Sequence, residues 1–413
     1  MFSRGGIDLP IRRKRLVAII LLAILFFPGV GSIALAQELK LSAQAAVLME
    51  ASSGEVIYEK NMHTPLPMAS ITKIMTLVLA LEAVEAGKAR LDDLVTTSEY
   101  ANKMGGSQIW LEVGEQMTLK DMLYAIAVGS ANDAAVAVAE YLSGSEANFV
   151  DEMNRRAKEL GLNNTVFSNA SGLPPKTLGM DAEHHASAYD LGLLSRHAVR
   201  IPLLVEMVST HEYVMRPDTT RKPILYTLNE LLDRVLESGR RYGYPGLDGL
   251  KTGMTSEAGY CLAASAQRDG MRLISVVLGN PTKEARTKDT VTLLDYGFRL
   301  YEPVTIARAG QSLGEALVSR GKQEKVSVST REDLTIGVPR GSKDDLTREM
   351  EWRKELIAPV EKGEVLGNLV VKQDGKEVAR IEVVADADVE RANMWQILVR
   401  MSKRLLQSIV PGR

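Results

Sequence analysis

The spacing of apolar residues divides the chain into segments with helical and segments with extended periodicity. Helical spacing predicts a long helix over residues 70–86, ended by Gly87, and further helices over 119–128, 133–142, 149–160, 187–200 and 287–301. Segments that alternate apolar and small residues predict two hairpins, 45–49 with 55–59 and 259–267 with 271–278. Strands at both ends with helices between them predict an α+β domain, a sheet flanked by helices, over residues 40–302.

After Pro303 the pattern changes to short strands. They are predicted over 325–328, 334–338, 366–372 and 378–384, and turns such as Asp374-Gly375 separate them. This predicts a small all-β domain over residues 303–388, in which we find no candidate chemistry.

The last segment, residues 389–413, is predicted to form an amphipathic helix. At 100° per residue its polar side chains, Arg400, Lys403 and Arg404 among them, share one arc, and large apolar residues such as Trp395 and Leu398 fill the other side. Such a helix either lies in a membrane surface or docks on the protein's own core. The positive charges and the tryptophan favour the membrane surface.

The first residues have the pattern of an export signal. Arg12 to Arg15 are basic, Leu16 to Phe27 are uninterruptedly apolar, Pro28-Gly29 breaks the run, and Ala34-Leu35-Ala36 has the small-x-small form of a cleavage site. A retained membrane helix is the alternative interpretation. The pattern predicts a signal peptide over residues 1–36 and an exported protein.

Charge and cysteine content exclude several classes of function. The chain has 50 basic and 52 acidic residues, and residues 1–36 hold five of the basic ones and one acidic one, so the remainder carries a net charge of −6. A mildly acidic chain without a basic tract argues against nucleic acid as a partner.

The single cysteine, Cys261, lies in an apolar run and is predicted to be a buried core thiol. No Cys/His cluster has metal-ligand spacing, so we expect no metal or cofactor, and we interpret the adjacent His184 and His185 as structural.

Three short polar motifs carry the candidate chemistry. In chain order they are Ser70-Ile71-Thr72-Lys73, Ser130-Ala131-Asn132 and Lys251-Thr252-Gly253. Each is weak alone, because an N-cap or a solvated lysine explains it equally well. Together they are typical of a serine acyl-transfer site in which lysine replaces histidine as the base.

The residue types fit that chemistry. If Ser70 opens a helix, Lys73 lies one turn on, and it can accept a proton only if burial or a second cation such as Lys251 lowers its pKa. Ser130 can relay a proton to the leaving amine, and Asn132 can bind a peptide-like substrate. Gly253 leaves room for a ligand backbone beside a strand edge. Lys251, Thr252 and Arg286 can bind a carboxylate, although Arg286 is equally explained as a surface residue.

At this point the chain resembles a known family. Met68 to Thr76, Ser130 to Ala135, Asn169 to Pro174 and Asp248 to Gly253 are similar to motifs of the low-molecular-mass penicillin-binding D-alanyl-D-alanine carboxypeptidases. The resemblance covers residues 40–300, and the β domain and tail extend it over nearly the whole chain. Two departures are mild: Ala131 replaces a common glycine, and Met254 occupies a variable position.

The resemblance implies a DD-peptidase fold shared with serine β-lactamases. It implies an acyl-enzyme on Ser70, proton acceptance by Lys73, a second active serine at Ser130, and an oxyanion hole from the backbone N–H groups of Ser70 and Met254. It also implies that peptidoglycan stem peptides are the substrate, that β-lactams inhibit, and that the enzyme works on the outer face of the cytoplasmic membrane.

Two alternatives remain open from the residues. A class A β-lactamase needs a glutamate as general base for deacylation, and candidates such as Glu183 lack a recognisable context. A wall-binding scaffold with an inactive site would be expected to lack motif residues, and all of them are present.

Overall fold

The computed structural model describes residues 39–216, 223–236 and 238–409, with the backbone alone at 401 and 403–409. It forms two separate units, residues 1–40 and 41–413, and the second holds all the elements described below. The predicted signal peptide, residues 1–36, lies outside the described residues. Within the described part of the chain, no helix combines the length and the apolar character that crossing a membrane requires.

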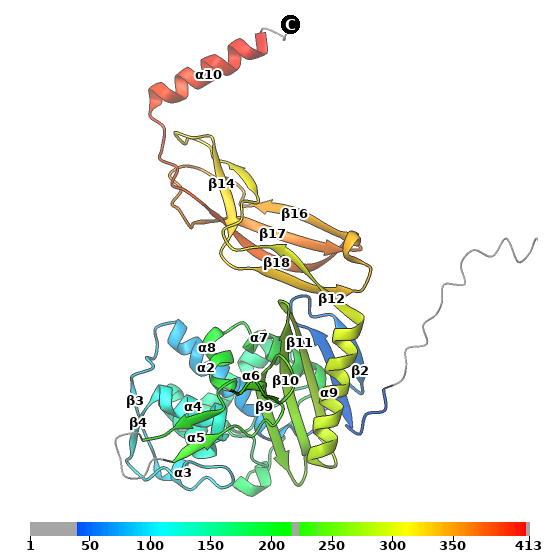
Figure 1. The fold of residues 1–413 in the computed structure, drawn as a ribbon. Coiled ribbons are helices and arrows are strands. Elements are labelled where there is room, and N and C mark those ends of the chain that lie inside the picture. The colour runs from blue at the N-terminus through cyan, green and yellow to red at the C-terminus, as the bar shows by residue number, and fades with distance from the viewer. Residues whose placement is uncertain (1–38, 217–222, 237, 410–413) are drawn as a thin grey trace, which may run out of the picture. The chain divides into compact units, whose positions relative to one another are not determined.

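The core of the larger domain is a five-stranded antiparallel sheet in the order β2-β1-β11-β10-β9 (Figure 1). Its strands are β1 (Ala45–Glu50), β2 (Val56–Lys60), β9 (Leu247–Thr255), β10 (Gly259–Arg268) and β11 (Met271–Asn280). Both predicted hairpins are confirmed, because β1 pairs with β2 and β10 pairs with β11.

Helices cover both faces of this sheet. A Cβ on Gly192 of α7 would meet Val47 and Met49, whereas one on Gly297 of α9 would meet Leu48 and Leu273. Neighbouring residues of a strand point to opposite faces, so α7 and α9 pack on opposite sides of the sheet. The domain is therefore of the predicted α+β class.

Most helices of this domain lie on the β9 side of the sheet in Figure 1, whereas α7 and α9 pack on its two faces. They are η1 (Ala69–Thr72), α2 (Lys73–Glu85), α3 (Glu99–Asn102), α4 (Leu119–Gly129), α5 (Asn132–Ser143), α6 (Glu146–Glu159), η2 (Pro175–Leu178), α7 (Ala188–Ala198), α8 (Pro202–Val208) and α9 (Lys283–Leu300). The domain also contains short two-stranded sheets: β3 (Leu94–Thr96) with β4 (Gln116–Thr118), β5 (Glu212–Val214) with β6 (Ile224–Tyr226), and β7 (Arg234–Val235) with β8 (Arg241–Tyr242).

The second domain is built from strands around a hydrophobic cluster of its own. One sheet has the order β13-β14-β18-β17-β16, and β12 pairs with β15. The elements are β12 (Tyr301–Ala307), β13 (Gly314–Leu317), β14 (Lys325–Thr330), β15 (Leu334–Pro339), η3 (Lys343–Asp345), β16 (Leu346–Trp352), β17 (Val365–Gln373), β18 (Lys376–Ala385) and the terminal helix α10 (Met394–Ile409). The predicted all-β character is confirmed, although β12, β13 and β16 were not expected.

Several predicted element boundaries were wrong. The helix expected over 70–86 begins as the 3₁₀ turn η1, and α2 starts only at Lys73. The last helix of the domain starts at Lys283, where the Thr282 side chain caps it, and Tyr301 already belongs to β12. The terminal helix starts at Met394, because Val389 is buried in the β-domain cluster and bridges Val360.

Candidate active site

The nucleophile candidate lies in a strained turn. Ser70 is the second residue of η1, rather than the first of an α-helix, and the preceding Ala69 has a φ of 48°. The Ala69 carbonyl accepts a hydrogen bond from Thr72 Oγ1 at 2.8 Å. Positive φ is uncommon for a residue with a side chain, and such strain often marks functional sites.

Lys73 is the first residue of α2 and is fully buried. Its Nζ lies 3.0 Å from Ser70 Oγ and 2.6 Å from Asn132 Oδ1, and it also contacts the Ser171 carbonyl. Burial lowers the pKa of Lys73 well below its ordinary value, Lys251 lowers it further, and Asp133 opposes the shift. A neutral amine has two N–H bonds and one lone pair. In that neutral form Lys73 can donate its two N–H bonds to the Asn132 amide oxygen and the Ser171 carbonyl and direct its lone pair to the Ser70 hydroxyl.

The S-x-N motif connects two helices beside Lys73. Ser130 ends α4 in the left-handed conformation, with a φ of 58°, and Asn132 begins α5. Both residues are buried. The Asn132 side chain is fixed on both sides, because its Oδ1 accepts from Lys73 and its Nδ2 donates to the Gly105 carbonyl at 2.7 Å.

The third motif lies inside β9, the edge strand, which the two predicted hairpins did not include. Burial and then Arg286 lower the pKa of Lys251 to about 7. Thr252 is buried next to it, and the Met254 side chain is exposed. Gly253 also has a structural role that the sequence did not indicate: a Cβ there would lie 2.8 Å from the Met68 carbonyl, so glycine lets β9 approach the Ser70 turn.

Arg286 is not the surface residue that one interpretation allowed. It lies in the first turn of α9 and is only 4% exposed. Its Nε has no hydrogen-bond partner among the described residues, and burial lowers its pKa. A buried guanidinium donor without a partner is costly, and an anion bound beside Lys251 would satisfy it.

Sequence reasoning missed the loop that supports the nucleophile from the other side. Ser171 supplies the carbonyl that contacts Lys73, and the Asn169 side chain shapes that turn by accepting from the backbone N–H groups of Ser171 and Gly172. The residues of this loop were part of a recognised motif, but the spacing gave no sign of these contacts.

His184, interpreted from the sequence as structural, reaches the same turn. Its Nδ1 accepts the Ser168 N–H at 3.0 Å, so Nε2 carries the proton and donates to Thr72 Oγ1 at 2.7 Å. Burial is the main cause that lowers the pKa of His184 to about 3, so the ring stays neutral.

Glu183 beside His184 is mostly exposed, with its carboxylate 3.9 Å from His185 Nδ1. Cys261 is buried as predicted, and burial raises its thiol pKa to about 11.

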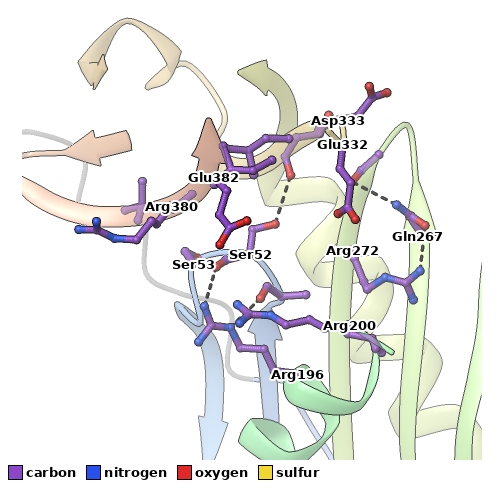
Figure 2. A pocket seen from close by; sticks show the side chains of 18 of the residues that line it. Ser52, Ser53, Arg196, Arg200, Gln267, Arg272, Glu332, Asp333, Arg380 and Glu382 are labelled. Carbon is purple, nitrogen blue, oxygen red and sulfur yellow. Dashed lines mark hydrogen bonds between the residues drawn. The ribbon is translucent and has the colours of Figure 1, made fainter. Parts of the chain in front are cut away.

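A cavity of about 1060 Å³ lies elsewhere in the chain, and no motif residue lines it. Figure 2 shows Arg196, Arg200 and Arg272 on one side and Glu332, Asp333 and Glu382 on the other. Arg196 is held by the carbonyls of Ala51 and Ser52, and Arg272 by Asp248. Because this cavity contains none of the three motifs, we assign the candidate chemistry to the region around Ser70.

Comparison with known proteins identifies the family of the chain. Residues 33–282 match the family model of D-alanyl-D-alanine carboxypeptidase, and residues 301–391 match that of the penicillin-binding protein 5 C-terminal domain. The chain is 39% identical over 394 residues to D-alanyl-D-alanine carboxypeptidase DacF of Bacillus subtilis, covering 94% of this chain and 97% of that protein.

Solved structures are similar as well. A peptidoglycan synthesis regulatory factor, PBP3, from Streptococcus pneumoniae is 30% identical with a TM-score of 0.69, covering 85% of this chain and all of that one. The ampicillin-bound penicillin-binding protein D2 of Listeria monocytogenes is 36% identical with a TM-score of 0.54, covering 63% of this chain and 99% of that one.

Proposed function

The chain belongs to the D-alanyl-D-alanine carboxypeptidase family, and from that premise we propose how its residues perform the reaction. It is a serine-type carboxypeptidase that removes the terminal D-alanine from peptidoglycan stem pentapeptides through an acyl-enzyme. The observation that carries the assignment to Ser70 is the fully buried Lys73, whose Nζ lies 3.0 Å from Ser70 Oγ and whose pKa is held well below its ordinary value by burial.

Acylation begins when Lys73 accepts the proton of Ser70. The freed oxygen attacks the carbonyl carbon of the penultimate D-alanine, and the backbone N–H groups of Ser70 and Met254 stabilise the oxyanion. Ser130 passes a proton to the leaving amine as the peptide bond breaks. Water then hydrolyses the ester and returns the proton to Ser70.

Carboxylate recognition follows from the two buried cations. Lys251 and Arg286 lie close enough for Arg286 to lower the pKa of Lys251, and among the described residues neither forms a salt bridge. The carboxylate of the leaving D-alanine supplies the missing anion, with Thr252 beside it. Asn132 binds the amide on the acyl side of the scissile bond.

A β-lactam should enter the same site as an acyl donor, and the relative from Listeria monocytogenes binds ampicillin. Fluorescent penicillin should label Ser70, and peptide mapping by mass spectrometry should locate the adduct. Ser70→Ala should lose both the label and turnover of a D-Ala-D-Ala-terminated peptide, while the exposed control Ser312→Ala keeps both. A label that persists on another serine in Ser70→Ala would reject the assignment. Rapid release of hydrolysed penicillin would indicate a β-lactamase instead.

The terminal helix supports attachment to a membrane surface. Met394, Trp395, Leu398 and Val399 are exposed, with Trp395 at 73%. Exposed apolar side chains on an amphipathic helix bury themselves in a lipid interface. The expected role of Arg400 needs correction, because its guanidinium donates to the Gly321 carbonyl at 2.7 Å and lies 3.6 Å from Glu324. Together with the predicted signal peptide, the exposed apolar face of this helix supports attachment of the enzyme to the outer face of the cytoplasmic membrane.

A further inference from the structure

Trp110 is displayed in an unusual way beside the active site. It has a φ of 53° and is 73% exposed, whereas Ile109 and Leu111 on either side are buried. The left-handed region is disfavoured for a bulky residue, and a large exposed aromatic ring gains nothing from folding. A conformation of this kind persists only when the surrounding structure fixes it.

The buried carboxylate of Asp133 holds the backbone on both sides of Trp110. Its Oδ2 accepts the backbone N–H of Ile109 at 3.1 Å and that of Leu111 at 3.2 Å. Arg216 donates to the Ile109 carbonyl at 3.2 Å, and Asn102 donates to the Leu111 carbonyl at 2.6 Å. The peptide groups around Trp110 are thus held, while its ring is left facing solvent.

The same loop is hydrogen-bonded to the S-x-N motif of the candidate site. The backbone N–H of Asn132 donates to the Ser107 carbonyl at 2.7 Å, and the Asn132 side chain donates to the Gly105 carbonyl. Asn132 in turn contacts Lys73. The carboxylate-binding cations come from β9 and α9, which are different elements. Trp110 therefore belongs to the Asn132 side, to which the proposed function assigns the acyl part of the substrate.

We propose that Trp110 is a specificity determinant that packs its indole ring against an apolar side group on the acyl-donor half of the substrate. The proposal rests on the proposed function, because it takes Ser70 as the acylated residue. In a penicillin the corresponding group is the 6-acylamino substituent, which remains on the enzyme after the ring opens. Stacking of two aromatic rings should change the acylation rate by roughly threefold to tenfold.

The test compares two β-lactams that differ only in that group. Benzylpenicillin carries a phenylacetyl group, and 6-aminopenicillanic acid carries none. Trp110→Ala should lower the second-order acylation rate about threefold to tenfold for benzylpenicillin and less than twofold for 6-aminopenicillanic acid. Trp110→Phe should retain most of the rate with benzylpenicillin, and Trp352→Ala in the β domain should change neither rate.

An equal loss with both compounds, or no loss with either, would overturn the proposal. These outcomes leave the proposed function standing as long as Ser70 is still labelled in Trp110→Ala.

A second experiment, tryptophan fluorescence, does not depend on normal folding of the alanine variant. With Trp352→Phe and Trp395→Phe together, Trp110 is the remaining tryptophan of the three. Its emission should change in the benzylpenicillin acyl-enzyme but not in that of 6-aminopenicillanic acid, and equal emission in both would again refute the contact.

Discussion

Replacing Gly172 by alanine should impair the chemistry as well as the stability of the enzyme. Gly172 has a φ of 82°, and an added Cβ would lie 2.0 Å from the carbonyl oxygen of Ala69 and 2.5 Å from its carbonyl carbon. Real Cβ contacts are essentially never shorter than 3.0 Å. The two backbone segments must therefore separate by about 1 Å, and Ala69 is bonded directly to Ser70.

The size of the effect follows from two contributions to stability. The left-handed conformation costs a residue with a side chain about 1–2 kcal/mol, and overpacking costs about 1–3 kcal/mol more. Their sum of about 2–5 kcal/mol should lower Tm by roughly 4–20 °C in a domain of this size. Because a displacement of about 1 Å at reacting groups can cost about 10²-fold, the acylation rate should fall by a similar factor.

Two glycines provide matched controls for backbone strain without a clash. Gly161 has a φ of 75° and Gly179 a φ of 71°, and an added Cβ would meet nothing within 4 Å at either position. Gly161→Ala and Gly179→Ala should lose only about 1–2 kcal/mol and should acylate at the wild-type rate.

The assay combines thermal unfolding with the rate of labelling by fluorescent penicillin, measured well below the Tm of every variant. Circular dichroism at the assay temperature would establish that each variant is folded. If Gly172→Ala resembles Gly161→Ala in both measurements, the reasoning that this glycine positions the nucleophile is refuted.

Further outcomes follow from the charged groups and the terminal helix. Lys73→Arg keeps a charge but cannot act as a base, so acylation should fall by about 10²-fold or more, while Lys251→Arg should retain more activity; equal loss would contradict this division of roles. Because the pKa of Lys73 is lowered, its neutral form is the base, and the acylation rate should fall as decreasing pH protonates it; a rate independent of pH down to the acid limit of stability would argue against it. The pKa of Lys251 is about 7 in the folded protein, against an ordinary value of 10.5, so between these pH values the unfolded chain binds more protons than the folded one. The free energy of unfolding should therefore rise with pH in this range, and it should rise less in Lys251→Met. Arg286→Ala should reduce turnover of peptides with a free terminal carboxylate far more than turnover of an ester lacking it, and a uniform loss would indicate a structural role. Truncation after Asn393 should release active enzyme from the membrane fraction, and Trp395→Ala should weaken binding to anionic vesicles; a truncated, processed protein that remains membrane-bound would exclude the helix as the anchor.

The hydrophobic pattern determined much of the architecture by itself. Strand alternation located both hairpins of the central sheet, since β10 and β11 meet across Asp269-Gly270 as the turn residues indicate. Local periodicity also found α4, α5 and α7 to within two residues at each end. These features depend on neighbours in sequence, which is why the sequence contains them.

Boundaries that depend on distant residues were not predictable. Ser70 lies in a 3₁₀ turn because the Ala69 carbonyl is held by Thr72 and enclosed by Gly172, which belongs to a different loop. The terminal helix starts late because Val389 bridges Val360 and is buried in the β domain. Periodicity continues through both positions, so it gives no sign of either contact.

The candidate site was likewise predictable only in part from the sequence. The motifs identified the types of residue, but burial and long-range contacts decide their chemistry. Lys73 is 59 positions from Asn132 and 98 from Ser171, and Thr72 is 112 from His184. A lysine becomes a base only when the fold removes water from it and places acceptors on two sides. That environment is a property of the packed tertiary structure, because each contact joins segments that the sequence keeps far apart.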